Sequence, residues 1–235
     1  MSRPLTDYEK YIRTEDLLSL QKPAAELSCH DELQFQVIHQ VAELWMKLLD
    51  HEMQLVQRLL QEDQAVRATG TLRRVHGYLK LLTDQMSQLD TMAPRAYMRI
   101  REVLGNGSGQ ESPGFKRMCQ LPGETWPHFA ALLERRGVTL RQIHETPEAH
   151  PEFFALAEGL MDYDQGLQFW RHRHLLLVYR AIGVGTPSLK GKYSDLLEKG
   201  MREQFFPALW HVREEVFAAW TAQMEASGRT RGYHG

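Results

Sequence analysis

Two histidines stand in apolar, helix-like stretches and are the residues best suited to chemistry. His39 lies four residues after Phe35, and His174 lies four residues after Trp170. Residues four apart share one face of a helix, so we expect each imidazole to lie beside an aromatic ring. A heme pocket needs a neutral imidazole to ligate the iron and an apolar wall to shield the porphyrin. The same pattern also fits an ordinary core histidine that is hydrogen-bonded within the protein.

The spacing of the other candidate ligands argues against a zinc or carboxylate-bridged metal site. His172 and His174 are two residues apart, which places them on opposite sides of a helix, so they cannot chelate one ion. The sequence contains no HExxH motif and no Glu-x-x-His pair. Its two cysteines, Cys29 and Cys119, are too few for a disulfide scaffold or a cysteine zinc cluster.

A third pair of residues could recognise a carboxylate. Tyr97 and Arg101 are also four residues apart, so the phenol and the guanidinium project side by side from a helix. The guanidinium fork can bind both oxygens of a carboxylate while the phenol adds a third donor. A surface tyrosine stacked on an arginine has the same spacing, and the sequence leaves both interpretations open.

Helical periodicity dominates the chain and predicts an all-α fold, a bundle of long antiparallel helices. The long final helix is expected to kink at Pro207, and Pro113 and Pro122 are expected in irregular chain. Residues 1–225 are predicted to form a single domain, followed by a disordered polar tail over 226–235. The predicted helices cover residues 31–60, 67–90, 96–104, 126–135, 139–144, 151–159, 163–182 and 193–224.

Composition excludes several functional classes. The 235 residues are 43% hydrophobic and 25% charged, as in ordinary globular proteins, and the net charge is only −2. This balance gives no electrostatic reason to bind nucleic acid or an anionic membrane. No apolar run approaches the roughly 18 residues of a membrane span. The first seven residues lack the apolar stretch of a signal peptide, so we expect a cytoplasmic protein.

Five stretches, in the same order along the chain, are similar to motifs of the tryptophan 2,3-dioxygenase family, a family of histidine-ligated heme-dependent aromatic oxygenases. The most specific is DELQFQVIHQVAELWMKL at residues 31–48, which resembles the family's HxExxFxxxHQxxELWMKL. The others are YEKYI with LLSLQ, YMRIREVLG, WRHRH and FFPAL, which resemble YxxYL with LLxxQ, YxxFRxxLG, WRxRH and FFPEL. The resemblance spans about residues 8–215 and implies an all-α enzyme that encloses heme b.

The resemblance implies roles around the heme for residues of two motifs. His174 is implied to be the proximal ligand of the heme iron, with Trp170 packing in the cofactor pocket. His39 is implied to lie on the distal side, near the indole nitrogen of the substrate. Phe35 is implied to pack against the indole ring.

Further residues are implied to bind the polar part of the substrate or to complete the pocket. Arg101 and Tyr97 would hold the substrate carboxylate, and Thr186 would contact its ammonium group. Tyr11 and Ile12 match positions by which this family's N-terminal segment reaches into the pocket of a neighbouring subunit. The resemblance therefore implies a homo-oligomer, a tetramer or a dimer.

Two segments depart from the family pattern, and they leave the reaction open. GTPSLKG at residues 185–191 stands for GTGGSSG, and LGNGSGQES at residues 104–112 stands for LGPSSGFQS and lacks its aromatic residue. The chain is also shorter than typical members between Phe115 and Glu158. The first expectation is insertion of O₂ into the indole C2–C3 bond of tryptophan or a substituted tryptophan, giving an N-formylkynurenine. The alternatives are insertion of one oxygen atom into a tryptophan or indole derivative, and a heme-binding bundle without turnover.

Overall fold

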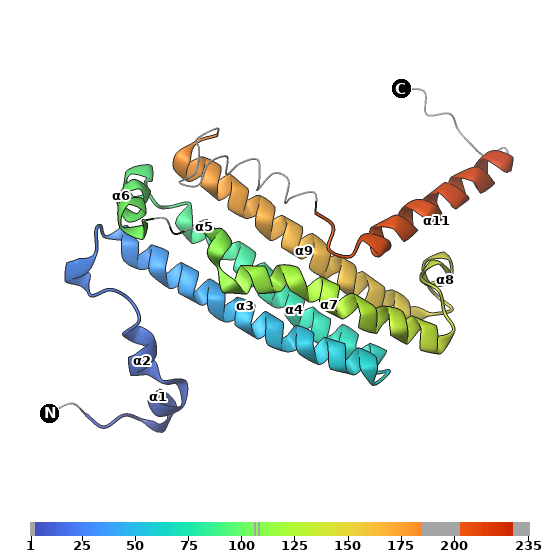
Figure 1. Ribbon diagram of the computed structural model, residues 1–235, viewed down its shortest axis with the longest axis horizontal. Coiled ribbons are helices and arrows are strands. Elements are labelled where there is room, and N and C mark those ends of the chain that lie inside the picture. Colours follow the sequence, from blue (N-terminus) through green and yellow to red (C-terminus); the bar gives the residue numbers. More distant parts are fainter. Residues whose placement is uncertain (1–2, 106, 108, 185–202, 228–235) are drawn as a thin grey trace.

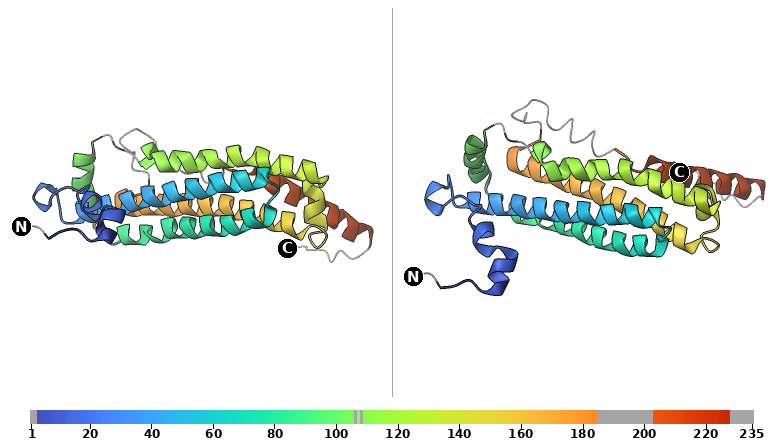
Figure 2. Two further views of the ribbon diagram at one scale, coloured as in Figure 1. Left: turned by 90° about the horizontal axis from the view of Figure 1, so that it is seen from below. Right: turned by 60° about the horizontal axis from the view of Figure 1, so that its bottom comes forward.

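Four long helices lie side by side and form an elongated bundle (Figures 1 and 2). The computed structural model describes residues 3–105, 107, 109–184 and 203–227, and all regular elements within them are helices. α3 and α7 run in one direction and α4 and α9 in the other (Figure 1). The predicted all-α bundle is confirmed. Its long helices are α3 (Asp31–Gln61), α4 (Ala65–Asp84), α7 (Pro113–Arg136) and α9 (Pro151–Ile182).

The remaining helices occupy the two ends of the bundle. α1 and α2 stand away from it, α6 lies across one end, and α11 extends beyond the other (Figure 1). None of the described helices is long and apolar enough to cross a membrane. These remaining helices are α1 (Asp7–Ile12), α2 (Thr14–Leu18), η1 (Ala24–Glu26), α5 (Met86–Leu89), α6 (Pro94–Leu104), η2 (Gly109–Glu111), α8 (Leu140–Glu145) and α11 (Pro207–Ala226).

The core forms where the apolar faces of the long helices meet. Leu72 and Leu79 of α4 are buried and lie against Gly159 and Gly166 of α9. A Cβ atom built on either glycine would lie 3.0 Å from the Cδ1 atom of the facing leucine. The two glycines, seven residues apart on one face of α9, therefore let α4 and α9 approach closely.

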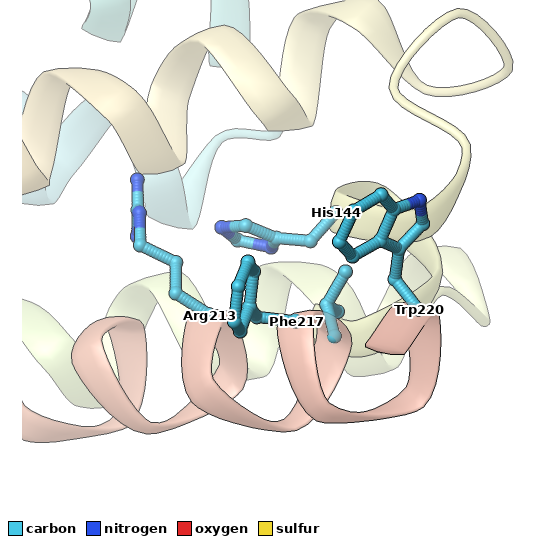
Figure 3. Close-up of a pocket in the computed structure, with 5 residues that line it drawn as sticks. His144, Arg213, Phe217 and Trp220 are labelled. Carbon is cyan, nitrogen blue, oxygen red and sulfur yellow. The ribbon is translucent and has the colours of Figure 1, made fainter. Parts of the chain in front are cut away.

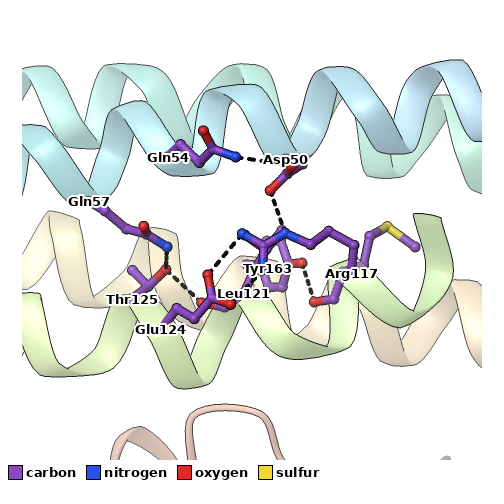
Figure 4. Close-up of polar contacts among 9 residues, drawn as sticks. Asp50, Gln54, Gln57, Arg117, Leu121, Glu124, Thr125 and Tyr163 are labelled. Atoms are coloured by element: carbon purple, nitrogen blue, oxygen red, sulfur yellow. Dashed lines mark hydrogen bonds and ion pairs between the residues drawn. The ribbon is translucent and has the colours of Figure 1, made fainter. Parts of the chain in front are cut away.

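α7 is one continuous helix, so the prediction of irregular chain at Pro113 and Pro122 is wrong. Pro113 occupies the first position of the helix, where a missing N–H costs nothing. Pro122 lies inside the helix and cannot donate to the carbonyl of Met118, four residues earlier. The buried hydroxyl of Tyr163 on α9 donates to this carbonyl instead, at 2.8 Å (Figure 4). A side chain 45 residues away thus replaces the lost backbone donor.

Polar contacts around Arg117 hold the same part of α7 against α3 (Figure 4). The Arg117 Nε donates to the carboxylate of Asp50 on α3 at 2.8 Å, and its guanidinium also pairs with Glu124. This guanidinium lowers the pKa of the Glu124 carboxyl below its usual value. After Pro122, Gln57 of α3 donates from Nε2 to the hydroxyl of Thr125 at 3.1 Å, so α7 is held against α3 on both sides of its proline.

Tyr163→Phe should destabilise the protein by about 1–3 kcal/mol, because it leaves the buried Met118 carbonyl without a donor. The free energy of unfolding in urea measures the change. Tyr78→Phe is the matched control, since the Tyr78 ring stacks on Trp45 and its hydroxyl has no hydrogen-bond partner among the described residues. Equal effects of the two substitutions would refute the role given to Tyr163.

Helix limits differ from the prediction at two other places, in α9 and at the end of α4. α9 continues through residues 159–163, because Gly159 is packed tightly on Leu72 and no proline interrupts the segment. α4 ends at Asp84, and the separate α5 follows it. No side chain caps the N-terminus of α3; the backbone N–H of Ser28 donates instead to the carboxylate of Glu32.

α11 begins at Pro207 rather than kinking there. Phe206 has non-helical dihedral angles, with φ −121° and ψ 68°, and Pro207 takes the first helical position. The carboxylate of Asp164, fully buried on α9, accepts hydrogen bonds from the backbone N–H groups of Phe205 and Phe206 and from Trp210 Nε1. These bonds hold the chain in its non-helical path before the proline. The earlier part of this predicted helix, over residues 193–202, lies outside the described residues.

Candidate active site

α3 places Phe35 and His39 on one face near its N-terminal end. Their ring centroids lie 4.0 Å apart, and His39 Nδ1 lies 2.7 Å from the carbonyl oxygen of Phe35. A carbonyl only accepts hydrogen bonds, so Nδ1 carries the proton and Nε2 keeps its lone pair. The ring is accessible, yet loss of hydration among the surrounding protein lowers the pKa of His39 below its usual value. His39 is therefore a neutral imidazole with a free acceptor at Nε2.

α6 brings Tyr97 and Arg101 to the same end of the bundle. The Tyr97 ring centroid lies 6.5 Å from that of Phe35 on α3. Partial burial raises the pKa of the Tyr97 phenol, while the nearby positive charge of Arg101 opposes this rise. Arg101 has no ion-pair or hydrogen-bond partner within the described part of the chain. A phenol and an uncompensated guanidinium thus stand together, as recognition of an anion requires.

α9 places Trp170 and His174 with their rings stacked. Their ring centroids lie 5.7 Å apart with an interplanar angle of 4°. The ring of Phe115 on α7 packs on Trp170, with 5.2 Å between the ring centroids. Burial, and secondarily the neighbouring His39, lower the pKa of His174 to about 4. His174 is therefore neutral near pH 7. Neither of its ring nitrogens has a hydrogen-bond partner among the residues that the structure describes.

The residues around His174 fit an imidazole-ligated heme. Iron needs a neutral imidazole with a free lone pair, and His174 provides one. The chain passes Nε2 of His174 at Gly109, where a Cβ atom would lie 3.8 Å from this nitrogen. This is an ordinary contact distance, and glycine leaves only backbone atoms beside the nitrogen. No cluster of three or more His, Cys, Asp or Glu residues in the described ranges could hold another metal ion.

Six of the residues predicted for the site meet at one end of the bundle. The contact of Phe35 with Tyr97 joins α3 to α6, and the electrostatic effect of His39 on His174 joins α3 to α9. The other three predicted site residues are not placed there. Tyr11 and Ile12 lie on α1, away from the bundle, with 89% and 39% of their surface exposed. Thr186 lies outside the described residues.

Gly109 was missed by the sequence analysis, which treated its segment only as a place where an aromatic residue is lost. The signal was present in the run Gly105, Gly107 and Gly109, since repeated glycines often mark a close approach of backbone to a ligand. No local pattern could have shown that this segment passes the imidazole of α9.

A pocket at the opposite end of the bundle contains none of the predicted site residues. Its volume is about 330 Å³, and side chains of α8 and α11 point toward one another around it (Figure 3). The hollow is open and mostly apolar, and its arginine is already engaged by Glu158. It lacks an uncompensated charge, so the chemistry points to the other end. The lining residues are His144, Arg213, Val216, Phe217 and Trp220.

Comparisons with known proteins point to one family. A model of the family described as Tryptophan 2,3-dioxygenase matches residues 1–128. A tryptophan 2,3-dioxygenase of Myxococcus xanthus (strain DK1622) is 30% identical over 90% of this chain and 90% of its own length. The protein of that name from Saccharopolyspora erythraea is 31% identical over 89% of this chain and 92% of its own length. The one from Serratia proteamaculans (strain 568) is 28% identical over 90% and 93%.

Proposed function

Because the chain belongs to the tryptophan 2,3-dioxygenase family, we propose that it is a heme-dependent dioxygenase that inserts O₂ into the indole C2–C3 bond of L-tryptophan or a substituted tryptophan. The observation that carries the proposal is the meeting of three helices at one end of the bundle. They bring together a neutral His174, a neutral His39 with a free acceptor, and the Tyr97–Arg101 pair.

Each side chain has a defined task in holding the substrate. Arg101 donates two hydrogen bonds to the substrate carboxylate, and the Tyr97 hydroxyl donates a third. The Phe35 ring packs on the indole, and Nε2 of His39 accepts the indole N–H. These contacts fix the amino acid at both ends, so the C2–C3 bond is held in one orientation.

His174 would hold the heme through Nε2, with Trp170 packed parallel to its ring. The heme, when bound, supplies the activation of O₂ and the oxygen chemistry. The chain's contribution is a fixed pose and an apolar surrounding, with no general base required at His39. Its neutral state, favoured by the loss of hydration among the surrounding protein, keeps Nε2 available as an acceptor.

The reaction is tested by the mass of the product. The purified protein is loaded with heme, reduced, and supplied with L-tryptophan and ¹⁸O₂. Incorporation of two labelled atoms supports dioxygenation, whereas one labelled atom indicates monooxygenation. Absence of product from L-tryptophan and from substituted tryptophans contradicts an enzyme of this kind.

His39→Phe should remove the preference of the site for an indole N–H. One hydrogen bond contributes about 0.5–1.5 kcal/mol, so the wild-type protein should bind L-tryptophan roughly 3–10 times more tightly than its benzothiophene analogue, in which sulfur replaces N–H. In His39→Phe the two affinities should be equal. Dissociation constants from calorimetry decide the matter, and a preference that survives the substitution assigns the contact elsewhere.

The exposed N-terminal segment supports a second part of the proposal, a homo-oligomer. Tyr11 and Ile12 project from a short helix that lies away from its own bundle. Apolar side chains in such a position are stabilised when a second copy covers them. We therefore infer that α1 packs against a neighbouring subunit, which sedimentation of wild-type protein and of Tyr11→Ser can test.

A further inference from the structure

The connection between α4 and α6 is fastened from two sides. Asp90 lies in this connection, and its carboxylate pairs with the guanidinium of Arg173 on α9. Arg180, also on α9, donates from Nε to the carbonyl oxygen of Asp90 at 3.2 Å. From the opposite side, Gln34 of α3 donates to the carbonyl oxygen of Gln88 at 3.0 Å. The connection is thus bound to both helices that carry the imidazoles.

Asp90 and Arg173 each lie next to a part of the candidate active site. Arg173 immediately precedes His174, and Asp90 lies four residues before Pro94, the first residue of α6. α6 carries Tyr97 and Arg101 but has few anchors of its own, since Ile100 is its one buried residue. The position of α6 relative to α9 therefore depends on the connection that precedes it.

The Asp90–Arg173 pair is mostly shielded from solvent, so it can hold the α4–α6 connection rigidly against α9; we call this link the joint. Its side chains are only 29% and 25% exposed. The second carboxylate oxygen of Asp90 is buried and has no hydrogen-bond partner within the described ranges. Removing Arg173 would leave this carboxylate without its counter-charge in a poorly hydrated place, so the pair resists separation.

We propose that the Asp90–Arg173 ion pair is a positioning element that sets the placement of the carboxylate-binding pair, Tyr97 and Arg101, relative to the heme ligand His174. This inference rests on the proposed function, because it assigns the pair a role in holding an amino-acid substrate. A displacement of about 1 Å between reacting groups can cost on the order of 100-fold in rate, so a joint between the two halves of the site matters.

Three variants of the heme-loaded protein test the joint: Arg173→Gln, Asp90→Asn, and the double exchange Arg173→Asp with Asp90→Arg. The two single substitutions should raise the dissociation constant of L-tryptophan at least about 10-fold. The Soret maximum and the heme content per chain should stay unchanged, because His174 is intact. The double exchange should recover part of the lost affinity. Should Arg173→Gln fail to fold, the isosteric Asp90→Asn carries the same comparison.

The matched control is Arg213→Gln. Arg213 pairs with Glu158 near the other end of α9, and both side chains are partly exposed as in the Asp90–Arg173 pair. Its loss should leave tryptophan affinity unchanged while costing a similar amount of stability. If the Asp90–Arg173 pair only stabilised the fold, Arg173→Gln and Asp90→Asn would behave like Arg213→Gln. Heme content per chain would then fall only as far as the folded fraction falls, and tryptophan affinity would not change.

The failure of this inference can be told from failure of the proposed function. Unchanged tryptophan affinity in Arg173→Gln and Asp90→Asn, combined with weakened affinity in Arg101→Ala, overturns the joint alone. Unchanged affinity in Arg101→Ala overturns the substrate-binding role of α6, and the joint falls with it. Recovery of affinity in the double exchange supports the joint, because only a direct pair responds to exchange of its charges.

Discussion

Replacing His174 by alanine should abolish tight heme binding. The loss should exceed the roughly 10–100-fold that removal of an outer-shell partner costs at a metal site, because the ligand itself is removed. The fold should survive, since the imidazole of His174 has no hydrogen-bond partner within the described part of the chain to leave unsatisfied. Titration with hemin, followed by the Soret band, and circular dichroism of the same samples measure the two effects separately.

His172→Ala is the control for this experiment. His172 belongs to the same helix, two residues away, and faces outward with an exposed side chain. Its substitution should leave the Soret band of a histidine-ligated heme intact. If His174→Ala keeps that band and His172→Ala loses it, the ligand has been assigned to the wrong histidine.

The second large effect is expected at Arg101. Loss of one partner of a desolvated charge pair costs about 2–5 kcal/mol, so Arg101→Ala should raise KM for L-tryptophan by roughly 30-fold or more. Arg101→Lys should recover only part of the loss, because an ammonium group lacks the planar fork that matches a carboxylate. Steady-state kinetics of the heme-loaded protein give KM and kcat for each variant.

Substrate analogues and a neighbouring arginine make the Arg101 experiment specific. Tryptamine lacks the carboxylate, so the wild-type protein should bind it far more weakly than L-tryptophan, and Arg101→Ala should remove this difference. Arg99→Ala alters an exposed residue of the same helix and should leave both affinities unchanged. Discrimination against tryptamine that persists in Arg101→Ala would place the carboxylate at another cation.

The parts of the fold predicted from sequence are those with long, uninterrupted periodicity. α3 extends from Asp31 to Gln61, within one residue of its predicted limits, because its apolar face repeats over eight turns. α7 could not be predicted in this way. Its local sequence contains Pro122, which removes a backbone hydrogen bond from the helix. The hydroxyl of Tyr163 replaces this bond, and it comes from a helix far along the chain. A local sequence pattern shows that a proline removes a backbone hydrogen bond, but it does not show which distant side chain replaces that bond.

In the candidate site, too, contacts within one helix could be predicted from sequence and contacts between helices could not. Spacing within one helix correctly paired Phe35 with His39 and Trp170 with His174, because residues four apart meet wherever a helix forms. Spacing could not show that α3, α6 and α9 converge, nor that Asp90 pairs with a residue 83 positions later. The roles of Tyr11, Ile12 and Thr186 remain predictions, since they depend on a second subunit or on residues beyond those described.

One spectroscopic titration tests most directly whether the heme ligand and the amino-acid clamp share a single site. L-Tryptophan is added to the ferric, heme-loaded protein while the Soret band and the heat of binding are recorded together. We predict a saturable spectral change with the same dissociation constant as the heat signal, and loss of both in Arg101→Ala. Tryptophan binding that generates heat without altering the heme spectrum, or a spectral change that persists in Arg101→Ala, would contradict this arrangement.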